Sequence, residues 1–123
     1  MRFLLERRHR RSADRTTALR FQLEHSKTSG ALEVIVLADL DGLEVSGAGD
    51  KALRRELAAY APLIGQSVFG VPLPPLLHGA DLEVRRLELH GRSYFLACIG
   101  GTAARDILIR DSISGVNRIM ATN

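Results

Sequence analysis

The sequence predicts an α+β domain in which a single antiparallel sheet of about five strands carries helices on both faces. Two apolar runs have the composition of buried central strands, a turn signal lies beside each run, and three longer stretches suit helices. Because short turns join the strands in pairs, the sheet is expected to be antiparallel. At 123 residues the chain has the length of one domain.

The first strand pair is predicted around residues 34–37, which read Val-Ile-Val-Leu. Such a continuous apolar run is typical of a central strand that is covered on both faces. The sequence Asp39-Leu-Asp-Gly42 then favours a hairpin turn, because Asp-Gly adopts the positive backbone angles of tight hairpins. Residues 43–46 are expected to return as the second strand.

A second strand pair is predicted over residues 82–99, with the turn at His90-Gly91-Arg92. Leu82 and Val84 alternate in one phase, whereas Leu87 and Leu89 alternate in the opposite phase. A β-bulge at Arg85-Arg86 would bring all four side chains onto one face. A further short strand at residues 67–71 would complete the sheet of about five.

Three helices are predicted, and the segment of the first one shows two competing patterns. Residues 16–26 alternate like a strand, but good helix formers and a capping Asp14 favour a helix, so both interpretations stay open. The second helix is expected at residues 51–63, capped by Asp50 and ended or kinked near Ala61 by Pro62. Thr102 is expected to cap the last helix.

The outward face of the second helix is expected to carry Arg55, Ala58, Ala59 and Pro62. Small side chains on an exposed face allow another helix to approach closely, which makes this face a candidate self-association surface. Alanine is also a good helix former wherever it lies. Both interpretations are consistent with the sequence.

No catalytic, cofactor-binding or metal site is predicted. The chain has one cysteine, Cys98, inside an apolar run where a thiol is usually a buried hydrophobe. Its four histidines are scattered without metal-ligand spacing. Gly100, Gly101 and Thr102 form a weak candidate for an anion site, since they offer backbone amides and a hydroxyl before a helix. We therefore expect no cofactor and no intrinsic enzyme activity.

Charge is concentrated at the N-terminus. Residues 1–20 contain seven arginines against Glu6 and Asp14, a balance of +5, whereas the whole chain carries +3. We expect residues 1–13 to form a basic, flexible arm and residues 14–123 to form the domain. The arm has one aromatic residue, Phe3, and none interleaved among the arginines at positions 7–11 for base stacking, so a solvated extension is favoured over a nucleic-acid contact. Without a signal peptide or an apolar stretch long enough to cross a bilayer, we expect a cytoplasmic protein with no transmembrane segment.

The stretch Val34-Ile-Val-Leu-Ala-Asp-Leu-Asp-Gly-Leu-Glu-Val-Ser-Gly-Ala-Gly49, followed by the helix Glu56-Leu-Ala-Ala-Tyr-Ala-Pro-Leu-Ile64, resembles the roadblock/LC7 family. The later strand pair and final amphipathic helix extend this resemblance from about Asp14 to Met120. The resemblance implies a profilin-like fold and a homodimer, or a heterodimer with a related domain. It also implies a small Ras-like GTPase as partner, and bacterial members are known. It places the dimer face on Arg55, Ala58, Ala59 and Pro62.

The expected function is therefore that of a non-catalytic dimeric interaction module that regulates or scaffolds a small Ras-like GTPase. Two alternatives remain open. One is a small-ligand sensor domain of the PAS or GAF type, for which the aliphatic core offers few polar groups to hold a ligand. The other is nucleic-acid binding through the arginine-rich arm.

Overall fold

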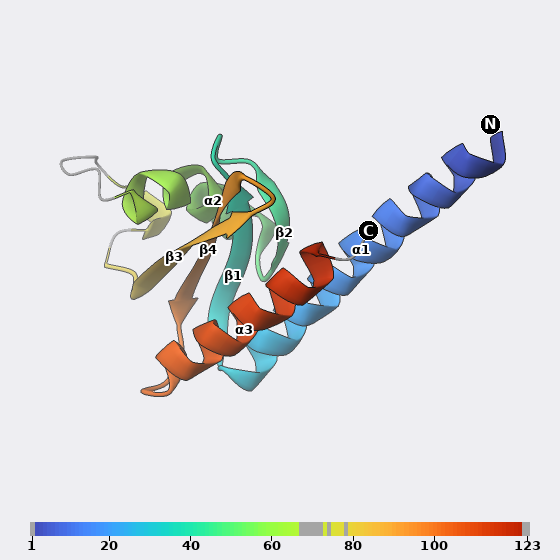
Figure 1. The fold of residues 1–123 in the computed structure, drawn as a ribbon. Coiled ribbons are helices and arrows are strands. Elements are labelled where there is room, and N and C mark those ends of the chain that lie inside the picture. The colour runs from blue at the N-terminus through green and yellow to red at the C-terminus, as the bar shows by residue number, and fades with distance from the viewer. Residues whose placement is uncertain (1, 67–72, 74, 78, 122–123) are drawn as a thin grey trace.

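The computed structural model describes the backbone of residues 2–66, 73, 75–77 and 79–121, with side chains from residue 13 onward. Three α-helices and one antiparallel sheet form three layers in this part of the chain (Figure 1). α1 (Arg2–Ser29) and α3 (Arg105–Met120) pack on one face of the sheet, and α2 (Lys51–Gly65) packs on the other. The α+β class with helices on both faces is therefore confirmed.

The sheet of the described residues has four strands in the order β2-β1-β4-β3. They are β1 (Leu32–Asp39), β2 (Glu44–Ala48), β3 (Leu82–Leu89) and β4 (Arg92–Gly100), with a short 3-10 turn at Pro75–Leu77. The two apolar runs form the central strands β1 and β4, as predicted. The expected fifth strand, at residues 67–71, lies outside the described residues.

Both predicted hairpin turns are present. The Asp39 carboxylate accepts hydrogen bonds from the backbone N–H groups of Asp41 and Leu43, each at 3.0 Å, which fixes the β1–β2 turn. At the β3–β4 turn, His90 and Gly91 have φ angles of 52° and 76°. Two successive positive φ angles are those of a type I′ hairpin turn.

The predicted bulge in β3 is wrong. Pairing between β3 and β4 runs without a register shift from Leu82 opposite Ile99 to Leu89 opposite Arg92. Leu82 and Val84 pack toward α2, whereas Leu87 and Leu89 pack toward α1 and α3. The two phases of alternation reflect a sheet with a core on each face, so no bulge is needed.

The first helix is longer than predicted. Residues 16–26 are helical, not extended, and α1 begins at Arg2 instead of after Asp14. The segment expected to be a flexible arm has no glycine or proline, so nothing in it interrupts the helical backbone. The division of the chain at residue 13 stays a prediction.

Two other helix boundaries differ from the expectation. α2 continues through Pro62 to Gly65, so Pro62 does not end the helix near Ala61. α3 begins at Arg105, and Thr102 is not its cap. The Thr102 hydroxyl instead accepts a hydrogen bond from the N–H of Ala104, 3.3 Å away, within the preceding turn.

The sheet separates two cores. The core under α1 and α3 includes Leu23, Ile35, Leu37, Leu96 and Val116, and the core under α2 includes Val34, Val36, Leu57, Phe95 and Ala97. Consecutive residues of β1 and β4 alternate between them, which explains why both strands are apolar throughout. The sheet is thus the middle layer of the body, and α2 is one of its outer layers.

Candidate functional site

The position of α2 is fixed at its beginning and along its inner face. The Asp50 carboxylate accepts a hydrogen bond from the N–H of Leu53 at 3.1 Å, as predicted for a helix cap. Leu53, Leu57 and Ala61 then repeat every four residues and are buried against the sheet. This packing determines which residues of α2 form its outer face.

The predicted outward face of α2 is partly wrong. Ala58 is 1% exposed and Pro62 is also buried, whereas Arg55 and Ala59 are exposed. Small side chains at Ala58 and Ala61 let the helix backbone approach the sheet, where Ala38 and Ala97 are also small. The buried stripe is therefore centred on small residues and not on the largest apolar ones.

The observed outer face of α2 is formed by Ala52, Arg55 and Ala59, all exposed. The β1–β2 turn lies against it, because a Cβ built on Gly42 would lie 3.2 Å from the Ala59 Cα atom. Leu40 and Leu43, on either side in this turn, are 54% and 64% exposed. We call these five residues the α2 surface.

Large exposed leucines beside a helix face of small residues are typical of an interaction site. Sequence reasoning identified the helix but missed the turn, although the leucines on both sides of Asp41-Gly42 were a readable signal. The α2 surface is thus the candidate functional site that the described side chains support best.

The candidate anion site at Gly100, Gly101 and Thr102 lies at the β4–α3 junction, where both glycines have positive φ angles of 86° and 104°. The Asp81 and Asp106 carboxylates line the same depression. Arg105 also lines this depression. Its guanidinium lies 3.0 Å from an Asp81 carboxylate oxygen, and the hydrogen bond to Asp81 raises the Arg105 pKa. The surrounding carboxylates disfavour an anion, and the site stays a prediction.

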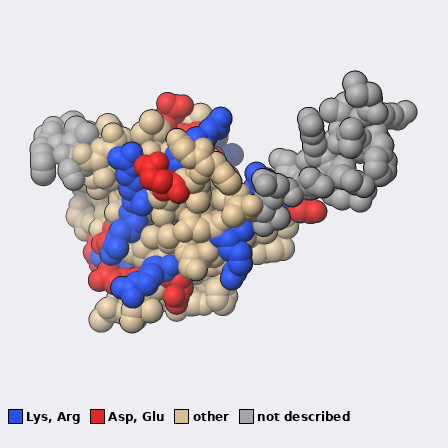
Figure 2. Space-filling view, viewed as in Figure 1, with Lys and Arg blue, Asp and Glu red and all other residues tan. Residues whose placement is uncertain are grey.

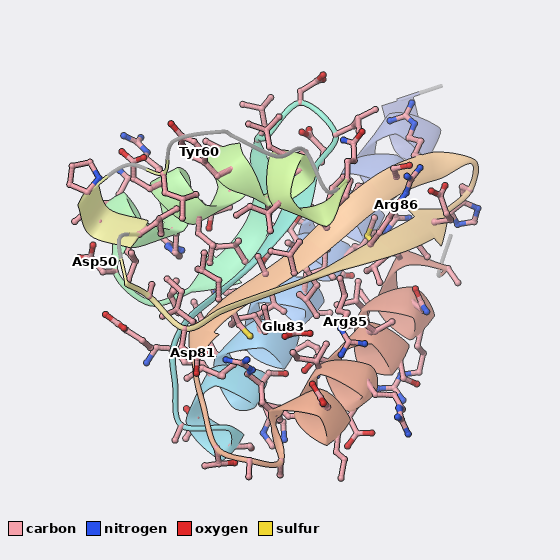
Figure 3. All side chains as sticks on the ribbon, turned by 90° about the vertical axis from the view of Figure 1, so that its left-hand side faces the viewer. Asp50, Tyr60, Asp81, Glu83, Arg85 and Arg86 are labelled. Atoms are coloured by element: carbon pink, nitrogen blue, oxygen red, sulfur yellow. The ribbon has the colours of Figure 1, made fainter. Side chains whose placement is uncertain are left out.

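A line of ion pairs along β3, which sequence reasoning missed, connects this junction to the sheet edge. Figure 3 shows Glu83 and Arg85 between β3 and α3. The Arg85 guanidinium lies 2.8 Å from a Glu83 oxygen and 3.3 Å from an Asp106 oxygen. These charges are paired among themselves, so they position α3 on β3 without offering a vacant site.

The Cys98 thiol is 1% exposed, and its burial raises its pKa to about 11. A thiol with a raised pKa is a poor nucleophile at neutral pH. Among the described residues, no group of three or more His, Cys, Asp or Glu side chains is arranged to hold a metal ion. The described part of the chain also contains no helix with the length and apolarity that crossing a bilayer requires.

No protein-family model matches the chain, and neither does any curated protein. The structure, however, is similar to that of MglB from Myxococcus xanthus, with a TM-score of 0.62. The match covers 88% of this chain and 93% of that one, at 16% sequence identity. The chain has a roadblock fold. At this identity the similarity establishes the fold, and the fold is the one that the sequence resemblance implied.

Proposed function

We propose that the chain is a dimeric, non-catalytic interaction module that regulates or scaffolds a small Ras-like GTPase. The observation that carries the proposal is the fold shared with MglB over nearly the full length of both chains, which agrees with the sequence resemblance that implies a small Ras-like GTPase as partner. The α2 surface gives this proposal a physical location.

The α2 surface supports the dimer part of the proposal through its shape and composition. Ala52 and Ala59 lie seven residues apart, two helical turns, so two copies of α2 can approach closely along this line. A stable homodimer buries about 800 Å² per partner, more than one face of a 15-residue helix offers. Leu40 and Leu43 of the neighbouring turn add the apolar area that such an interface needs.

The GTPase part of the proposal needs no catalytic group in this chain. A regulator that docks on a GTPase changes its nucleotide cycle by binding one conformation better than the other. The proposal therefore predicts a difference in affinity between nucleotide states, and not an activity of the isolated chain.

The test is a titration of the chain against purified Ras-like GTPases from its own genome, each loaded with GDP or a non-hydrolysable GTP analogue. Calorimetry is expected to show at least one GTPase that binds with an affinity differing about ten-fold or more between the two states, which is about 1.4 kcal/mol. Absence of binding to every GTPase in both states would refute the GTPase partner. The dimer is tested separately, by solution mass.

A further inference from the structure

β2 is an edge strand of the described sheet. The strand order β2-β1-β4-β3 gives β2 one neighbour, and its other side faces no strand among the described residues (Figure 1). An edge strand offers backbone N–H and C=O groups to which an extended peptide can add as a further strand. The side chains that line this edge therefore decide which peptide can add to it.

A groove of about 420 Å³ lies between α1, on one face of the sheet, and the beginning of α2, on the other. The residues that line it are Arg20, Glu24, Lys27 and Thr28 of α1, Gly47 and Ala48 of β2, the following Gly49, and Arg54 of α2. Because helices on opposite faces of the sheet form its two walls, the groove opens at the edge of the sheet. The two glycines contribute only backbone atoms to its lining.

The groove has an excess of positive charge. Three of its side chains are cations, Arg20, Lys27 and Arg54, and one is an anion, Glu24. Lys27 takes part in none of the ion pairs between described residues. On the face shown in Figure 2, by contrast, basic and acidic side chains of the body lie next to one another. Residues 21–123 contain ten Lys or Arg against twelve Asp or Glu, so the groove is a cationic site on an acidic body.

Arg54 has an unsatisfied donor at this site. Its Nη1 atom lies 3.3 Å from a Glu44 carboxylate oxygen and 3.4 Å from the Gly47 carbonyl oxygen, and both distances exceed those of ordinary hydrogen bonds. A Cβ built on Gly47 would lie 3.1 Å from the Arg54 Cδ atom, so this side chain lies over the β2 backbone. Its Nε atom is buried and has no hydrogen-bond partner in the described part of the chain. A carboxylate can accept from Nε and Nη together, which would satisfy this donor.

From these observations we infer that the groove binds an extended peptide with a run of acidic residues, which adds to β2 as a further strand. Successive side chains of a strand point to opposite faces. The groove has a cation on each side, Lys27 from α1 and Arg54 from α2. Consecutive carboxylates of the added strand therefore each find a cation. A peptide N–H replaces Arg54 as the donor to the Gly47 carbonyl oxygen, and Arg54 turns to a carboxylate.

Other occupants fit these features less well. Glu24 and Glu44 lie beside the cations of the groove and repel a free phosphate dianion, whereas a peptide carries single charges that alternate in direction. A helix satisfies its backbone groups internally and leaves those of the edge strand without a partner. The inference is independent of the proposed GTPase partner and dimer, because no residue of the α2 surface lines the groove.

The test measures binding of the full chain to a fluorescein-labelled peptide of about ten residues by anisotropy. The peptide has four consecutive glutamates at its centre, flanked on each side by Thr-Val-Thr. One control peptide has lysines in place of the glutamates. A second control has N-methyl groups on the backbone nitrogens of its glutamates, which keeps the carboxylates and prevents strand pairing.

Three variants of the chain locate the contact. Lys27→Gln removes a cation that makes no ion pair with a described residue, so folding should be unaffected. Arg54→Lys keeps the charge but loses the Nε donor and the planar guanidinium. The matched control is Arg110→Gln, which removes an exposed charge from α3. Circular dichroism checks that each variant is folded.

We expect the wild-type chain to bind the glutamate peptide and neither control peptide. Lys27→Gln should weaken this binding about five-fold, and Arg54→Lys about ten-fold, whereas Arg110→Gln should bind like the wild type. In nitrogen-15 correlation spectra, the amide signals of Gly47 and Gly49 should shift when the glutamate peptide is added, because the peptide pairs with this backbone.

Four results would overturn the inference. Absence of binding of the glutamate peptide at about 50 mM salt, where screening is weak, would remove the site. Equal binding of the N-methylated peptide would mean that charge alone holds it. Equal affinities of Lys27→Gln and Arg110→Gln would place the contact elsewhere. Inorganic phosphate that displaces the peptide at a concentration below the peptide's own Kd would assign the groove to a free anion.

Discussion

The Ser26 and Ser112 hydroxyl oxygens lie 2.6 Å apart, and both side chains are only 1% exposed. This hydrogen bond joins α1 to α3. The Ser112 hydroxyl also lies 2.8 Å from the Leu108 carbonyl oxygen, and the Ser26 hydroxyl lies 3.0 Å from the Gln22 carbonyl oxygen. The two hydroxyl protons serve three contacts, so one serine donates to the other while the second serine donates to its own backbone carbonyl.

Replacing Ser112 with alanine removes the contact between the helices but leaves Ser26 bonded to Gln22. We expect the free energy of unfolding to fall by about 1 kcal/mol, the usual net value of one hydrogen bond. Urea denaturation monitored by circular dichroism measures this change. Ser114→Ala, at an exposed position of the same helix, should leave the stability nearly unchanged. Equal effects of both substitutions would show that the Ser26–Ser112 bond adds nothing.

Two glycines with positive φ should differ in their sensitivity to alanine. Gly91 has a φ of 76° and open space around it, so Gly91→Ala should cost about 1–2 kcal/mol from backbone strain alone. At Gly49 the φ is 117°, and a Cβ would lie 2.9 Å from the Glu33 carbonyl oxygen. Gly49→Ala should therefore cost more than Gly91→Ala, because rigid backbone would have to move. Thermal unfolding of both variants decides this order, which the reverse ranking would contradict.

The buried thiol of Cys98 should make stability depend on alkaline pH. Burial raises its pKa from an ordinary 9.0 to about 11 in the folded chain. Below pH 9 the thiol is protonated in both the folded and the unfolded chain, so it does not make the free energy of unfolding depend on pH there. Between pH 9 and 11 only the unfolded chain loses the proton, and the free energy of unfolding falls by about 1.4 kcal/mol per pH unit.

Comparison of the wild-type chain with Cys98→Ala isolates this contribution from other groups that titrate at alkaline pH. The variant should lose less stability than the wild type between pH 9 and 11. The folded wild type should also react slowly with a thiol reagent at pH 8, and quickly in urea. Fast reaction of the folded chain would mean that the thiol is accessible.

The central strands were predictable from the sequence because their signal is local. Continuous apolar residues in β1 and β4, and the Asp-Gly and His-Gly turns beside them, specify strands whatever the rest of the chain does. The first helix was harder, because Leu19, Phe21 and Leu23 alternate like a strand although Phe21 is exposed and only the two leucines are buried. Leu19 and Leu23 are four residues apart, so both lie on the same side of a helix.

The orientation of α2 could not be predicted from residue size. Tyr60 and Ile64 are large and apolar, but both are only half-buried. Ala58 and Pro62 are buried because the helix lies close to the small side chains of the sheet, a property of the packed pair and not of the helix alone. The same limit applies to β3. Its four apolar side chains were expected to face one core, but they pack in pairs against the two cores on opposite faces of the sheet.

The proposed dimer forms through the α2 surface. Ala59 is exposed in the single chain, so Ala59→Glu should leave folding intact while placing a charge at the centre of the interface. Ser114→Glu places the same charge on an exposed position of α3 and is the matched control. Circular dichroism of both variants should match the wild type.

Sedimentation equilibrium of the three proteins tests this claim most directly. We expect the wild type and Ser114→Glu to have twice the chain mass of 13.5 kDa, and Ala59→Glu to have the chain mass itself. A wild-type chain that sediments as a monomer at high micromolar concentration, or an Ala59→Glu variant that remains a dimer, would contradict the account.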